Sequence, residues 1–102
     1  MERANQKHRT LAAKTAFSEA PGETQPIAGA VARIFLRRDA SHHALQQMQG
    51  FLETSVTGDY ATGQAGSPRM GYWYVIDVTD RRDLDQIRAK APHLIDGWME
   101  FN

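Results

Sequence analysis

A chain of 102 residues, 41% of them hydrophobic, is long enough for one domain with a single modest core. Its twelve basic and twelve acidic side chains leave no net charge, so overall charge gives no long-range attraction to nucleic acid or to an anionic membrane. The lack of cysteine excludes disulfides, thiolate nucleophiles and cysteine-based metal sites, and no apolar run is long enough to span a membrane. We therefore expect a cytoplasmic protein that binds neither nucleic acid nor membrane.

The first 26 residues predict a flexible arm, and residues 27–102 predict the folded domain. The arm is rich in Gln, Thr, Ala and charge, and Leu11 and Phe17 are the large apolar residues in its middle. Two such residues cannot anchor a helix in water. The arm ends in a run that contains Pro21, Gly22 and Pro26, which favours irregular structure.

Residues 30–37 predict the first strand, and residues 41–54 predict the first helix. In the strand, Ala32, Ile34 and Leu36 share one face, whereas Arg33 and Phe35 lie on the other face. Asp39 or Ser41 can cap the helix. Its apolar stripe consists of Leu45, Met48 and Leu52. We expect Gly50 to weaken the helix, and we expect no metal site at the adjacent His42 and His43, which project in different directions on a helix.

Residues 55–60 predict a second, weak strand, and residues 61–69 predict a flexible hairpin loop. Gly58, Gly63, Gly66 and Pro68 interrupt this stretch. Neither of the two common glycine-rich phosphate-binding motifs is present. The loop is therefore interpreted as a mobile lid over a pocket, because long loops in small domains are often functional.

Residues 71–78 predict a central strand, since both of its faces are apolar. Tyr74 and Ile76 share one face, and Trp73, Val75 and Asp77 share the other. A helix follows over residues 80–91, with Thr79 or Asp80 as its cap. Its apolar stripe is Leu84, Ile87 and Ala91, and Pro92 ends it.

Residues 98–101 predict the last strand, and with it the order βαββαβ. This is the split βαβ plan of ferredoxin-like α+β folds, in which a four-stranded antiparallel sheet carries both helices on one face. The helix-covered face is predicted to receive Ala32, Ile34, Leu36, Tyr74, Ile76, Met99 and Phe101. The other face is predicted to carry Arg33, Phe35, Trp73, Val75, Asp77, Trp98 and Glu100. An exposed face with two Trp and one Phe indicates a ligand or partner surface, and we expect a homodimer to form through it.

The run YWYVIDVTDRRDLDQIRAKAPHLIDGWMEF resembles the C-terminal half of the dimeric α/β-barrel superfamily, in its muconolactone isomerase-like and YCII-like members. The likeness lies in a strand ending in Asp, a short helix, a turn with Pro and a final strand with alternating apolar residues. It covers about residues 71–102. It implies two sheets packed face to face, with small aromatic or apolar compounds bound in the barrel or between sheet and helices. It supplies no catalytic residue.

Two functions follow from this face. In the first, a cofactor-independent enzyme or binding protein holds a small apolar or aromatic molecule, with Phe35, Trp73 and Trp98 as apolar walls. Arg33 would fix an anionic group, and Asp77 or Glu100 would serve as acid or base. In the second, the aromatic face is a non-enzymatic module that binds another protein. A purely structural alternative also stays open, in which the aromatic rings fill a dimer interface and Arg33 pairs with Asp77 or Glu100 across strands.

Overall fold

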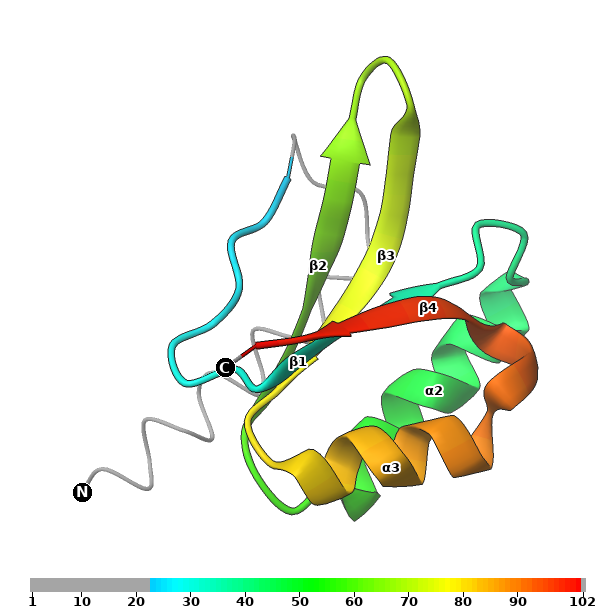
Figure 1. Cartoon of the computed structure of the whole chain (residues 1–102). Coiled ribbons are helices and arrows are strands. Elements are labelled where there is room, and N and C mark those ends of the chain that lie inside the picture. Colours follow the sequence, from blue (N-terminus) through cyan, green and yellow to red (C-terminus); the bar gives the residue numbers. More distant parts are fainter. Residues whose placement is uncertain (1–22, 102) are drawn as a thin grey trace.

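The structure is a computed structural model that describes residues 23–101 (Figure 1). Its elements are β1 (Ala32–Leu36), α2 (His42–Ser55), β2 (Tyr60–Ser67), β3 (Gly71–Val78), α3 (Arg81–Lys90), the short 3-10 helix η1 (Pro92–Leu94) and β4 (Ile95–Glu100). The predicted α+β class, with two helices and a four-stranded antiparallel sheet, is confirmed. Residues 1–22 of the predicted arm lie outside the described part of the chain.

The strands lie in the order β2-β3-β1-β4, and all neighbours are antiparallel. Each helix therefore joins two strands that have one other strand between them. Residues Val75–Val78 of β3 pair with β1, whereas β2 pairs with β3 along its whole length. The β2–β3 hairpin consequently extends beyond the rest of the sheet as a two-stranded ribbon, as Figure 1 shows.

Both helices lie on the same side of the sheet (Figure 1), and the core fills the space between them. From the strands it contains Ala32, Ile34, Leu36, Tyr60, Ile76 and Val78, and from the helices Met48, Leu52, Leu84 and Ile87. Five residues lie on the helix-covered face as predicted. Four of them, Ala32, Ile34, Leu36 and Ile76, belong to the core cluster, and the fifth, Tyr74, is partly buried and packs against it. The side chain of Ser41 caps α2 and that of Asp80 caps α3, and each is one of the two caps predicted for its helix.

The prediction of a weak strand at residues 55–60 followed by a flexible lid is wrong. Helix α2 continues to Ser55, and residues 61–67 of the stretch assigned to the lid belong to the eight-residue strand β2. Its small residues Ala61, Gly63 and Ala65 have low strand propensity, yet they pair with Asp77, Val75 and Trp73 of β3. Backbone pairing with a strongly β-forming neighbour overrides the local preference of β2.

The face assignment of the last strand is also wrong. β4 begins at Ile95, and an irregularity in its pairing with β1 lets Leu36 oppose Ile95 while Phe35 opposes Gly97. Beyond this bulge Trp98 opposes Ile34, Glu100 opposes Ala32, and Met99 opposes Arg33. Trp98 and Glu100 therefore lie on the helix side and Met99 on the open side, the reverse of the expectation. A bulge adds one residue and so exchanges the faces of all residues after it.

Gly50 lies on the exposed surface of α2, and an added Cβ would meet nothing within 4 Å. Gly50→Ala is expected to raise the free energy of unfolding by about 0.5 to 1 kcal/mol, measured by urea denaturation, because alanine loses less backbone entropy in a helix. Gly66 is the contrasting position, since its φ is +134° and a Cβ would collide with the carbonyl oxygen of Gly71. Gly66→Ala should destabilise the protein, and equal effects of both substitutions would contradict this account.

Candidate functional site

The open face of the sheet, opposite the helices, holds the predicted site residues of β1 and β3. Arg33 opposes Asp77 and Phe35 opposes Val75 in the β1–β3 pairing, so these four residues share one face. Trp73 lies two residues before Val75 on the same face of the ribbon. Five of the seven residues expected here are therefore brought together.

Arg33 and Asp77 form a buried ion pair. The guanidinium Nε donates to Asp77 Oδ1 at 2.7 Å, and Nη2 donates to Oδ2 at 3.0 Å. The two residues are 4% and 2% exposed. This two-pronged geometry satisfies both carboxylate oxygens at once. The pairing of Arg33 with Asp77 across strands is one of the two cross-strand pairs that the sequence left open.

Residues 23–31 cover this ion pair from the open side. Arg33 Nη2 donates to the backbone oxygen of Thr24 at 2.8 Å, and the N–H of Ile27 donates to Asp77 Oδ2 at 3.3 Å. Thr24 also exchanges hydrogen bonds with the backbone of Gln64, its N–H reaching the Gln64 oxygen at 2.8 Å. Gly63 makes this approach possible, because a Cβ there would lie 2.7 Å from Cβ of Thr24. The contacts of Thr24 extend the folded domain to residues before 27.

The two candidate acid/base residues are not brought together. Asp77 is held under residues 23–31, whereas Glu100 lies on the helix side with its Oε1 at 2.8 Å from Arg81 of α3. Glu100 also accepts a hydrogen bond from the Trp98 indole at 3.3 Å. Arg33 is engaged with Asp77, and each of the two candidate acid/base residues is engaged in an ion pair of its own.

The uncovered part of the open face contains an aromatic hollow. It measures about 210 Å³ and is lined by Phe35, Trp73, Asp96, Gly97 and Trp98. The rings of Phe35 and Trp73 meet edge to face, with centroids 6.2 Å apart and planes at 87°. The Trp73 indole Nε1 donates to Asp96 Oδ2 at 2.9 Å. Trp98 reaches the hollow from the sheet edge, although its backbone position belongs to the helix side.

Two arginines stack on the indole rings. The Arg38 guanidinium carbon lies 4.3 Å from the Trp73 ring centroid, and that of Arg88 lies 3.9 Å from the Trp98 centroid. Arg38 also donates to the backbone oxygen of Met70 at 2.6 Å, which ties the hairpin to the end of β1. These contacts fix both indoles without placing an arginine among the residues that line the hollow.

Sequence reasoning missed Asp96 and Arg38. Asp96 precedes the predicted last strand at residues 98–101, because the bulge hides it from a period-two pattern. The Asp-Gly pair at residues 96 and 97 was the only local signal. Arg38 lies two residues after the end of β1, and its role depends on the position of the hairpin, which the sequence did not predict.

The described residues contain no group of three His, Cys, Asp or Glu side chains placed to hold a metal ion. Within the same part of the chain, no helix is long and apolar enough to cross a membrane. Among known proteins, no family model, no curated protein and no solved structure matches the chain. The resemblance to dimeric α/β barrels accordingly stays a prediction, and the functional argument depends on the geometry of the open face.

Proposed function

We propose that this protein is a cytoplasmic binding protein of the ferredoxin-like, dimeric α/β-barrel class that holds a small apolar or aromatic organic molecule in the aromatic hollow. One observation carries the proposal: Phe35 of β1, Trp73 of β3 and Trp98 of β4 line a single hollow to which Asp96 adds a carboxylate. Ligand sites are commonly apolar, with a few polar groups that orient the ligand. No cofactor is required for this role.

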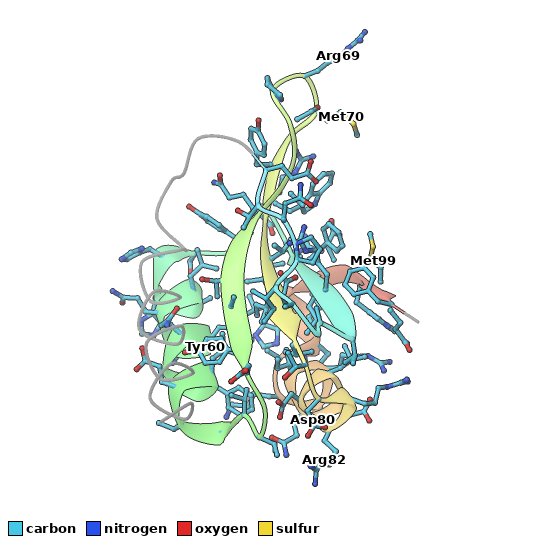
Figure 2. The ribbon with its side chains drawn as sticks, turned by 90° about the vertical axis from the view of Figure 1, so that its left-hand side faces the viewer. Tyr60, Arg69, Met70, Asp80, Arg82 and Met99 are labelled. Carbon is cyan, nitrogen blue, oxygen red and sulfur yellow. The ribbon has the colours of Figure 1, made fainter. Side chains whose placement is uncertain are left out.

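A second copy of the chain is proposed to close the hollow. At about 210 Å³ the hollow is smaller than the roughly 300 to 1,000 Å³ typical of ligand pockets. The open face beside it presents Met99, which is 46% exposed and whose side chain points away from the backbone of β4 in Figure 2. Trp98 at its edge is 40% exposed. Packing of two such open faces would bury Met99 and deepen the pocket.

Binding is proposed rather than catalysis. Both carboxylate oxygens of Asp77 accept hydrogen bonds within the protein, and Glu100 lies on the other side of the sheet. A general acid or base must reach its substrate within hydrogen-bond distance. Asp96 is the carboxylate that lines the hollow, and its hydrogen bond to Trp73 gives it an orienting role.

Trp73→Ala is expected to abolish ligand binding, because it removes one wall of the hollow. The measurement is a protein-observed NMR titration with a panel of small aromatic acids, neutral aromatic compounds and organic cations. Tyr72→Ala is the matched control, since Tyr72 is an aromatic residue of the same ribbon that points to the opposite face. A stable dimer that binds none of the panel would refute the proposal, and so would equal losses in both variants.

Met99→Glu is expected to shift a homodimer to a folded monomer, because a carboxylate would then face the partner sheet. Analytical ultracentrifugation gives the oligomeric state, and circular dichroism reports the fold. Gln46→Glu adds the same charge on the exposed surface of α2 and should leave the dimer intact. A wild-type chain that stays monomeric at high concentration would contradict the dimer.

The projecting hairpin favours a second candidate, a module that binds another protein. Arg69 and Met70 stand at its far end in Figure 2, and Met70 is 65% exposed. A large exposed apolar side chain at the tip of an extended ribbon suits a protein contact. A monomer that binds no compound of the panel would favour this function.

A further inference from the structure

The charged residue that lines the aromatic hollow is acidic, and Arg38 lies over the ring of Trp73 beside it. Asp96 is the charged residue among those that line it, and its side chain is exposed. Arg33, the cation expected to bind an anionic ligand, is instead buried against Asp77. The neighbouring Arg37 is held by two hydrogen bonds to Asp39, each 3.0 Å long. Besides these hydrogen bonds to Asp39, Asp96 also contributes to the raised pKa of Arg37, although within residues 23–101 it forms no ion pair with a basic side chain.

The rings of the hollow attract cations elsewhere in this same structure. Trp73 and Trp98 each carry an arginine over one ring face, at 4.3 and 3.9 Å from the centroids. Arg88 lies in a separate hollow that it forms with Pro92, Ile95 and Trp98. An indole face is electron-rich and binds ammonium or guanidinium groups. The rings of Phe35 and Trp73, which meet at the aromatic hollow, are aromatic surfaces of the same kind and are suited to a positive charge from outside the chain.

Resting on the proposed function, we infer that the ligand of the aromatic hollow is a small organic cation with an alkylated ammonium group. The group would lie among Phe35, Trp73 and Trp98, with Asp96 supplying the countercharge. Alkylated ammonium ions suit such a site, because their methyl groups contact aromatic rings while their charge stays poorly hydrated. The size of the hollow, about 210 Å³, fits a head group rather than a drug-sized molecule.

The test compares choline with its uncharged isostere 3,3-dimethylbutan-1-ol and with benzoate, at constant ionic strength. The indole N–H signal of Trp73 is the reporter, because that group donates to Asp96 beside the ligand position. Choline is expected to shift this signal and to bind about fivefold more tightly than the isostere, the difference that one exposed charge pair supplies in water.

Asp96→Asn tests the source of this preference. Asparagine keeps an oxygen that can accept from Trp73 and removes the charge, so choline should then bind no more tightly than the isostere. Glu53→Gln is the control, since Glu53 is an exposed carboxylate on α2 that does not line the hollow. This variant should keep the fivefold preference.

Each other result overturns the inference. Equal binding of choline and its isostere, tighter binding of benzoate, or an unchanged preference in Asp96→Asn would refute a cation site while leaving small-molecule binding at the hollow in place. A response to a trimethyllysine peptide without one to choline would replace the small molecule by a protein partner. A lack of response to all probes, including the aromatic panel, would refute the proposed function as well.

Discussion

Arg33→Ala is expected to lower the free energy of unfolding by about 3 to 5 kcal/mol, because it leaves the Asp77 carboxylate charged and buried without its partner. The side chains of Arg33 and Asp77 are 5% and 3% exposed, so little solvent screens their charges in the folded protein. The backbone oxygen of Thr24 would lose its donor as well. Urea denaturation of the full chain measures the effect.

The exposed pair Arg37–Asp39 provides a matched control. Its Nε and Nη2 atoms bind the two carboxylate oxygens in the same pattern, but the side chains are 50% and 69% exposed. Arg37→Ala should leave the denaturation midpoint nearly unchanged, because exposed ion pairs add little to stability. The hydrogen bond from Arg37 lowers the pKa of Asp39.

A double variant shows whether the folded protein needs the charges of the pair or only needs to avoid a buried, unpaired charge. Arg33→Met combined with Asp77→Leu should recover much of the stability lost in Arg33→Ala, because neither side chain is then a buried, unpaired charge. Recovery should be incomplete, since Thr24 and Ile27 each lose a hydrogen-bond partner. Equal effects of Arg33→Ala and Arg37→Ala would show that water reaches the pair in solution and that Arg33 is available to a ligand.

Sequence periodicity predicted the elements whose own residues determine their structure. β3 is correct at both ends, since its alternating aromatic and β-branched residues favour a strand in most contexts. The two helices are correct within one residue at each end, because the caps Ser41 and Asp80 and the breaker Pro92 are local signals.

The elements that depend on distant partners were not predictable in the same way. β2 is a strand because it pairs with β3 and because Thr24 packs on Gly63, and neither contact leaves a local pattern. The face of Trp98 depends on a bulge opposite Phe35 and Leu36. The observed site differs from the predicted one accordingly. Phe35 and Trp73 lie on the predicted face, whereas Arg33 and Asp77 form an ion pair with each other. Asp96, at the bulge in β4, lines the hollow.

Ile76→Ala is expected to lower the free energy of unfolding by about 2 to 5 kcal/mol, because it removes buried methyl groups and leaves a cavity. Ile76 is fully buried, and it lies between Ile34 of β1 and Thr62 of β2 in the centre of the sheet. The neighbouring strands fix its backbone, so the surroundings cannot collapse easily into the space. Ile76→Val should cost about 0.5 to 1.5 kcal/mol, as expected for the loss of one methyl group.

Met70→Ala at the hairpin tip is the control, because it also shortens a large apolar side chain, but one that is 65% exposed. It should change the free energy of unfolding by no more than about 0.5 kcal/mol. The comparison also tests the arrangement of the open face. Residues alternate along a strand, so Ile76 can lie in the core only if Val75 and Asp77 face the other way. A cost for Ile76→Ala as small as that for Met70→Ala would mean that β3 is turned over. Trp73 would then point into the helix-covered core, and the aromatic hollow could not exist.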